Sequence, residues 1–317
     1  MKTRLASIGV SIGLALIAIS LFSLGASPTA QAGSLLGSAP AALPGRALNA
    51  APGLAPSSAP TFTVYLPLVQ KNFSPVADIV LIPAGSFQMG CDPNHNQGNL
   101  CDGDNPLHTV HLDTYQIDKN LVTNAQYAQC VTAGGCTVPS DTSSSTHISY
   151  YGNATYSNYP VIWMTWNQAS AFCSWTGKRL PTEAEWEKAA RGSSDTRPYP
   201  WGDTAPNCTL ANFKNSTGDC VGDTTAVGSY PSGASPYGVL DMAGNVWEWV
   251  NDWYSSTYYN SSPLNNPPGP TTGTLKVLRG GGWYNATAQY LRMAFRDYIG
   301  YGPTELNYVG FRCAATP

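Results

Sequence analysis

The chain has 317 residues, of which 11% are charged and 43% hydrophobic, and its formal net charge at pH 7 is −3. This composition provides no basic stripe for nucleic acid and no polybasic patch for anionic lipid. We therefore expect no nucleic-acid partner. The sequence also lacks the nucleophile elbow, P-loop and dinucleotide motifs, so the corresponding enzyme classes have no motif support.

Residues 1–32 have the pattern of a secretory signal peptide. Lys2 and Arg4 precede an apolar run over residues 8–24, and a small-x-small cleavage site follows at residues 30–32. A membrane anchor is the alternative, but it usually needs roughly 20 uninterrupted apolar residues, and glycines and serines interrupt this run. We expect an exported protein, secreted or held at the cell surface, without membrane insertion after cleavage of the signal.

Residues 33–77 form an Ala/Pro/Ser-rich segment with little charge. Such a segment buries too little apolar surface to offset the entropy of ordering, so we expect a linker or stalk. The remaining residues, 78–317, are enough for one domain with a sizeable core.

Within this domain, three helix starts show a capping box, in which a threonine is followed three residues later by Gln or Glu. They are Thr123 with Gln126, Thr165 with Gln168, and Thr182 with Glu185. Glycines at 134–135, 177 and 192 predict where these helices end. Strands are expected at residues 79–83, 87–89, 109–112, 115–119, 277–279 and 309–314. The pattern predicts an α+β domain with much irregular structure.

The eight cysteines are an even number in an exported chain, which favours disulfides over free thiols. Proximity along the chain predicts three pairs, which leave the last two cysteines to each other. The predicted pairs are Cys91 with Cys101, Cys130 with Cys136, Cys208 with Cys220, and Cys173 with Cys313. In the chain-entropy model a short ring stabilises by about 3 kcal/mol and the long one by nearer 5 kcal/mol.

Two loops carry oxygen side chains suited to a hard cation. Asn212 and Asp219 lie in a loop closed by the predicted pair at 208 and 220, and Asp241 and Glu248 flank a turn at residues 242–245. Carboxylate and carboxamide oxygens, together with turn carbonyls, are ligands that calcium accepts. The alternative is that these are ordinary turn residues bonded to their own backbone.

Several segments resemble the formylglycine-generating (sulfatase-modifying factor) family. They are IPAGSFQMG at 82–90, GKRLPTEAEWEKAARG at 177–192, YPWGD at 199–203, YGVLDMAGNVWEWVNDWY at 237–254, LRGGGW at 278–283 and GFRCA at 310–314. They follow the family's order and span nearly the whole domain. The resemblance implies a compact, irregular fold akin to a C-type lectin.

The resemblance also implies two structural calcium sites. The first would use Asn212, Asp219 and the carbonyls of Phe213 and Val221. The second would use Asp241, Glu248 and the carbonyls of Gly244 and Val246. The pair of Cys173 and Cys313 matches a structural disulfide of the family.

One departure from the family concerns its reactive chemistry. The resemblance implies two cysteines shortly after the glycine turn, whose thiolates bind copper(I) and activate oxygen to oxidise a substrate cysteine to formylglycine. Here the segment reads GGGWYNATAQYLRMAFRD, with Asn285 near the first position and residues 288–290 near the second. Copper and oxidase activity are therefore not expected.

The same segment is rich in aromatic and polar residues, which suit a binding surface. The predicted ligand-binding residues are Trp247, Trp283, Tyr284, Asn285, Tyr290, Asp297, Tyr298, Tyr301 and Glu305. The expected function is a calcium-stabilised module that binds a protein, peptide or glycan through the 283–308 surface. Two alternatives stay open: an enzyme of the family, with Glu248 and Asp297 as candidate acid or base, and a structural surface protein.

Overall fold

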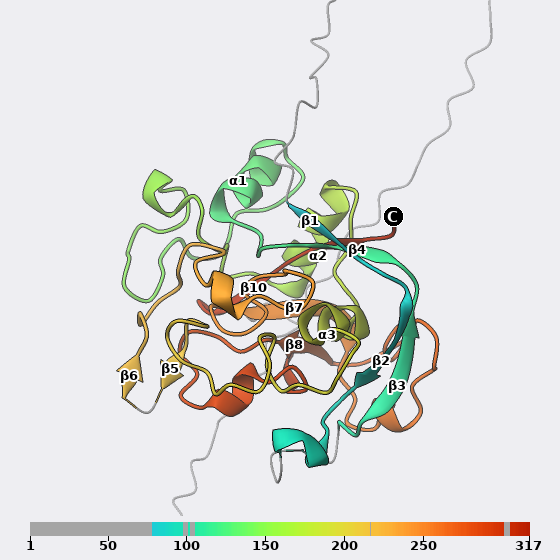
Figure 1. Ribbon diagram of the computed structural model, residues 1–317. Coiled ribbons are helices and arrows are strands. Elements are labelled where there is room, and N and C mark those ends of the chain that lie inside the picture. The colour runs from blue at the N-terminus through green and yellow to red at the C-terminus, as the bar shows by residue number, and fades with distance from the viewer. Residues whose placement is uncertain (1–77, 98–100, 102–104, 216, 301–304) are drawn as a thin grey trace, which may run out of the picture. The chain divides into compact units, whose positions relative to one another are not determined.

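The computed structural model describes residues 78–97, 101, 105–215, 217–300 and 305–317. The predicted signal peptide, the linker and Tyr301 lie outside these residues. In the described ranges, no helix is long and apolar enough to cross a membrane. Short helices and strands are joined by long irregular connections, as the α+β prediction requires (Figure 1).

The three α-helices begin at the predicted positions. They are α1 (Asn124–Thr132), α2 (Trp166–Trp175) and α3 (Glu183–Arg191). Each follows its predicted threonine, whose side chain accepts a hydrogen bond from the third helical N–H at 3.2 Å. The remaining helical turns are short: a π-helical turn at Pro93–Gln97 and 3-10 turns at Ala154–Tyr156, Pro231–Gly233, Tyr258–Asn260 and Ala288–Leu291.

The strands form several small sheets. They are β1 (Ile79–Ile82), β2 (Gly85–Met89), β3 (His108–Leu112), β4 (Tyr115–Asp118), β5 (Lys214–Asn215), β6 (Gly218–Asp219), β7 (Trp247–Trp253), β8 (Leu275–Arg279), β9 (Asp297–Gly300), β10 (Val309–Phe311) and β11 (Ala314–Ala315). One sheet has the order β1-β4-β11 and another β10-β7-β8-β9, while β2 pairs with β3 and β5 with β6. The predicted strand at 309–314 is two strands, because β10 lies parallel to β7 whereas β11 joins β4.

Helix α3 lies between the β2–β3 pair and the four-stranded sheet, and it contacts β2, β3, β7 and β8 (Figure 1). All nine of its residues are buried, including the charged ones. Its carboxylates meet arginines from elsewhere in the chain: Arg279 of β8 lies 3.3 Å from Glu183, and Arg296 lies 2.7 Å from it. This helix is therefore held by buried ion pairs as well as by apolar packing around Trp186.

A second part of the core joins α2 to the end of the chain. Trp247, Trp249 and Phe311 pack with Phe172 of α2, and the indole N–H of Trp249 donates to the carbonyl of Met164 at 2.7 Å. A disulfide between residues 173 and 313 ties the same region together. The last strands of the domain are thereby fixed to its middle.

Candidate functional site

The two loops predicted to bind a cation lie against each other. The backbone N–H of Asn245 donates to the carbonyl of Asn212 at 2.8 Å. Gly244, with φ of 82°, makes this approach possible, because a Cβ there would lie 2.5 Å from the same carbonyl oxygen. Asp241 and Asn245 also adopt positive φ, at 56° and 65°. The turn is therefore a specific, tightly packed structure.

The carboxyl groups of this turn are buried next to one arginine. Glu248 is fully buried and accepts two hydrogen bonds from Arg312, at 2.6 and 2.9 Å. Asp241 accepts one hydrogen bond from the N–H of Gly228 at 2.7 Å. Burial, with a further contribution from Glu248, raises the pKa of Asp241 to about 6. Glu248 is thus already paired with the guanidinium, whereas Asp241 has no direct ion pair and is the carboxyl group that a bound cation would stabilise.

The first loop, which carries Asn212 and Asp219, offers a second indication of a cation site. Asn212 is 1% exposed, and its amide donates to the carbonyl of Asp223 at 2.7 Å. Its Oδ1 is buried and has no hydrogen-bond partner among the described residues. Asp219 is instead half exposed, 3.6 Å from Lys214, and the carbonyl of Phe213 accepts the N–H of Cys220 at 3.0 Å. An orphaned buried oxygen fits a cation, but the described residues include no cluster of three or more His, Cys, Asp or Glu side chains placed to hold one.

The cysteines form the four predicted disulfides, and all eight are among the described residues. No cysteine is free. Four disulfides indicate an oxidising, extracytoplasmic environment. They also leave no thiol for a pair of reactive thiolates.

Asn285 stands where the first reactive cysteine was expected. It is 6% exposed, and its side-chain oxygen accepts the N–H of Gly282 at 2.7 Å. The side chain therefore holds the glycine turn, and its ligand-binding role stays a prediction. Trp247, also predicted to bind a ligand, is fully buried and packs against Tyr290 and Phe295.

The other aromatic residues of the 283–308 segment lie between core and solvent. The rings of Tyr284 and Tyr308 are 4.1 Å apart, and Trp283 meets Tyr284 edge to face at 5.9 Å. Tyr298 is 44% exposed and lies 4.0 Å from the ring of Tyr254. Tyr290, Asp297 and Glu305 are half-buried. The segment therefore presents a partly exposed aromatic surface with carboxylates beside it.

Burial changes the pKa values of two polar groups on this surface. It raises the pKa of the Tyr284 hydroxyl, and the neighbouring Tyr308 adds to the effect. Burial likewise raises the pKa of the Asp297 carboxyl, although a hydrogen bond from the N–H of Tyr298 opposes it. Tyr284 thus stays a hydrogen-bond donor at physiological pH.

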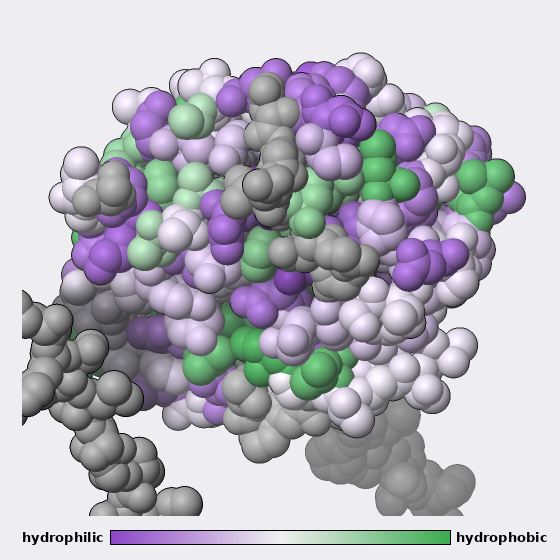
Figure 2. Space-filling model, turned by 90° about the horizontal axis from the view of Figure 1, so that it is seen from below, coloured by the Kyte–Doolittle hydropathy of each residue, from purple (hydrophilic) through white to green (hydrophobic). Residues whose placement is uncertain are grey.

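The two loops predicted to bind a cation and the aromatic segment are joined directly. The N–H of Trp283 donates to the carbonyl of Asn245 at 2.9 Å, and the N–H of Trp247 donates to that of Tyr308 at 2.8 Å. The turn at 241–248 therefore positions both ends of the 283–308 segment. On the face seen in Figure 2, hydrophobic residues form small areas separated by hydrophilic ones.

A family model described as "Sulfatase-modifying factor enzyme 1-like domain" matches residues 66–317. The chain belongs to this family. It is 35% identical to a formylglycine-generating enzyme of Streptomyces coelicolor over 282 residues, which covers 74% of this chain and 88% of that enzyme.

Two solved structures are similar to this chain over three quarters of its length. PvdO from Pseudomonas aeruginosa is 28% identical with a TM-score of 0.61, and covers 75% of this chain and 94% of its own. Treponema denticola variable protein 1 is 26% identical with a TM-score of 0.60, and the match covers 75% of this chain and 95% of that protein. These similarities confirm the predicted fold.

Sequence reasoning missed two features of this family member. Arg312, which binds Glu248, lies in the GFRCA motif but carries no local signal of its partner. Lys276 is buried between two tryptophans beside a pocket, and its pattern in the sequence is that of any strand residue. Both depend on contacts between residues far apart in the chain.

Proposed function

We propose that this chain is an extracytoplasmic, secreted or surface-held binding module that uses the family's fold without its thiolate oxidase chemistry. The observation that carries the proposal is that all eight cysteines are in disulfides, while the Asn285 side chain is engaged in the glycine turn. Copper(I) is bound by soft thiolates, and a carboxamide does not replace them. The expected ligand is a protein, a peptide or a glycan.

The 283–308 segment supports this proposal as the binding surface. Tyrosine provides a large and stiff contact area with a polar end. The half-buried Tyr284 and Tyr308 lie with their rings 4.1 Å apart, and Tyr298, beside Tyr254, is 44% exposed.

The second candidate is an enzyme of the family, and the 35% identity to a formylglycine-generating enzyme favours it. Glu248 is poorly suited as its acid or base, because Arg312 occupies both carboxylate oxygens. Of the two groups predicted to act as an acid or base, Asp297 is therefore the better candidate. A purely structural surface protein is the third candidate.

Calcium is the proposed structural cofactor. Asn212, through its orphaned Oδ1, and Asp241, through its buried carboxyl group, are the residues that fit it best. Asp219, Glu248 and the carbonyls of Phe213, Val221, Gly244 and Val246 complete the two proposed ligand sets. Calcium would neutralise the buried carboxylates and join loops that support the 283–308 segment.

The proposed function is tested by a thiol count and an oxidase assay on the same sample. We expect no free thiol in denaturant without reductant, and no formylglycine from a CxPxR peptide with copper and oxygen. The Streptomyces coelicolor enzyme serves as the positive control. Product formed by this chain would contradict the proposal and favour the enzyme.

The same protein is then screened against defined glycan and peptide panels, and each hit is measured with Tyr298→Ala. An aromatic anchor contributes on the order of 1–2 kcal/mol, so affinity should fall roughly tenfold or more. Ile148→Ala, outside the 283–308 segment and 93% exposed, is the control and should bind normally. A panel without binders, or binding that Tyr298→Ala leaves unchanged, would count against this surface.

Calcium should stabilise the folded protein. At a concentration 100-fold above its dissociation constant, a ligand of the native state adds about 2.7 kcal/mol. For a domain of this size, the melting temperature should rise by roughly 5–10 °C over that in EDTA. Differential scanning calorimetry measures this shift.

Asp241→Asn is the matched variant, because it keeps the shape of the side chain and removes its charge. It should melt no lower than wild type in EDTA and should lose much of the calcium response. Asp113→Asn, at an exposed turn, should keep the full response. A wild-type melting temperature that calcium does not change would contradict the proposed cofactor.

A further inference from the structure

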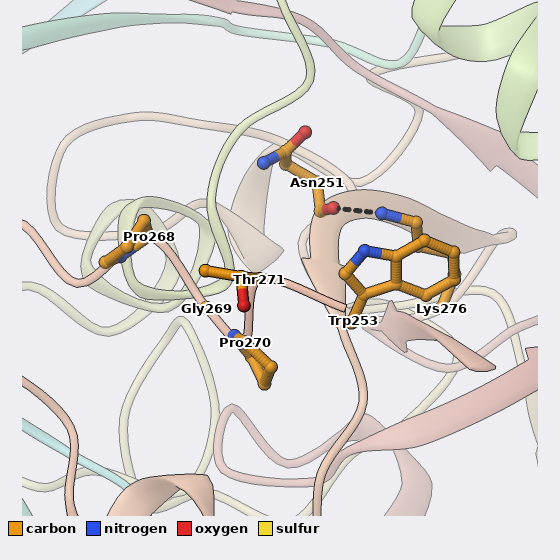
Figure 3. A pocket seen from close by; sticks show the side chains of 7 residues that line it. All are labelled: Asn251, Trp253, Pro268, Gly269, Pro270, Thr271 and Lys276. Atoms are coloured by element: carbon orange, nitrogen blue, oxygen red, sulfur yellow. Dashed lines mark hydrogen bonds between the residues drawn. The ribbon is translucent and has the colours of Figure 1, made fainter. Parts of the chain in front are cut away.

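A pocket lies where β7 and β8 meet the loop at residues 268–271. Its volume is about 280 Å³, and its lining includes Asn251, Trp253, Pro268, Pro270, Thr271 and Lys276. Figure 3 shows the Trp253 ring and the Lys276 side chain on one side and the prolines of the loop on the other. Asn251, Pro268 and Thr271 are exposed, so the pocket opens to solvent there. None of its residues belongs to the candidate sites described above.

The amine of Lys276 is held in a defined position at this pocket. Its Nζ donates to the carbonyl of Asn251 at 2.7 Å (Figure 3). It also lies 4.0 Å from the ring centroid of Trp166, on α2, and 3.9 Å from that of Trp253. Trp253 is the cross-strand partner of Lys276, next to a register shift between β7 and β8. The amine is therefore placed by both the helix and the sheet.

Burial acts against the charged form of Lys276, whereas the two indole rings and the carbonyl of Asn251 stabilise that form. The residue is 3% exposed, and burial lowers the pKa of the amine to about 8. The Asp252 carboxyl acts in the opposite direction, but burial and the nearby Glu183 raise the pKa of that carboxyl as well. The residues of α2 that pack here carry no charge. At pH 7 the neutral fraction of such an amine is roughly 200-fold larger than that of an ordinary lysine.

We propose that Lys276 is a nucleophilic amine that forms an imine with a small, largely apolar aldehyde bound in this pocket. A lysine desolvated in an apolar pocket is an activated nucleophile. Its nitrogen lone pair forms a bond to the carbonyl carbon, the C=O bond breaks, and the oxygen leaves as water with the two protons of the amine. The imine needs no oxidant or reductant.

The shape and lining of the pocket define the class of aldehyde. A volume of 280 Å³ corresponds to roughly nine water molecules at about 30 Å³ each, enough for a compact, one-ring molecule. Trp253, Pro268 and Pro270 provide apolar walls, while Asn251 and Thr271 offer polar atoms at the opening. This inference is independent of the proposed binding function at the 283–308 surface.

The test uses the full chain and benzaldehyde with cyanoborohydride, which reduces an imine to a stable secondary amine. Peptide mapping by mass spectrometry then measures the rate at each lysine and separates the N-terminal amine. At pH 7, Lys276 should be labelled at least tenfold faster than Lys214, which is exposed. Lys276→Arg keeps the positive charge and should abolish this adduct.

A second variant keeps the test decisive if Lys276→Arg folds poorly. Thr271→Trp lies on the exposed rim, so it should fold normally while blocking the opening. It should slow the labelling of Lys276 roughly tenfold and leave Lys214 unchanged. The proposal is overturned if native Lys276 reacts no faster than Lys214, if it reacts only after denaturation, or if blocking the opening has no effect.

Discussion

Replacing Arg279 with methionine should destabilise the fold by about 3–5 kcal/mol, the range expected when one partner of a buried ion pair is removed. Arg279 is fully buried and lies 2.5 Å from Glu187 and 3.3 Å from Glu183. It also donates to the carbonyl of Met293. Methionine fills much of the same space, so most of the loss should come from the carboxylates that remain without it. Urea denaturation at pH 7 measures the change in the free energy of unfolding.

The pH dependence of this variant gives a further check. Burial alone would raise the pKa of Glu183, but Arg296 and Arg279 outweigh it, so the pKa in the native protein is lowered. The stability that this group contributes is therefore present at neutral pH and lost as the pH falls through its folded pKa. In Arg279→Met only Arg296 remains beside Glu183, so the pKa of this carboxyl group should be less strongly lowered, and protonation at low pH should relieve part of the lost charge compensation. The difference from wild type should thus shrink between pH 7 and pH 4.

Arg197→Met is the matched control, because Arg197 pairs with Asp195 at 2.6 Å on a more exposed part of the chain. Exposed pairs contribute about 0–1 kcal/mol, so this variant should stay close to wild type. If Arg279→Met also costs less than about 1 kcal/mol at pH 7, the idea that buried ion pairs hold α3 is wrong.

Removing the disulfide between residues 173 and 313, by replacing both cysteines with alanine, should cost about 5 kcal/mol in the chain-entropy model. The two cysteines are 140 residues apart in sequence and both fully buried. Without the bond, the unfolded chain regains the freedom of a long loop, and the end of the domain loses its link to α2. We expect the melting temperature to fall by roughly 10–20 °C, as measured by circular dichroism without reductant.

The disulfide between Cys130 and Cys136 is the control, since it spans only 6 residues. The same model assigns about 2 kcal/mol to so short a ring. Replacing this pair with alanine should therefore cost less than half as much. Equal losses in the two double variants would mean that local packing, and not the length of the closed loop, determines the stabilisation.

What the sequence determined by itself was local. Each helix start depends on one threonine and a Gln or Glu three residues later, so the capping boxes at Thr123, Thr165 and Thr182 could be predicted without knowledge of the fold. Cysteines close in sequence could also be paired, because their pairing depends on local sequence alone. The family motifs added the order of the segments and the expected fold.

Only the tertiary structure decided which residues meet across the chain. Strand β7 was not predicted, because the alternation that begins at Trp247, Glu248 and Trp249 is not continued by the following residues, and Glu248 is buried like its neighbours. Helix α3 has the composition of a solvent-exposed helix, yet its charges are buried because Arg279 and Arg296 come from distant segments. Trp247, predicted as a ligand-binding residue, lies in the core, where its ring packs against Tyr290 and Phe295. The pocket beside Lys276 likewise exists only where α2, β7 and β8 come together, since burial and pairing depend on contacts that no local pattern records.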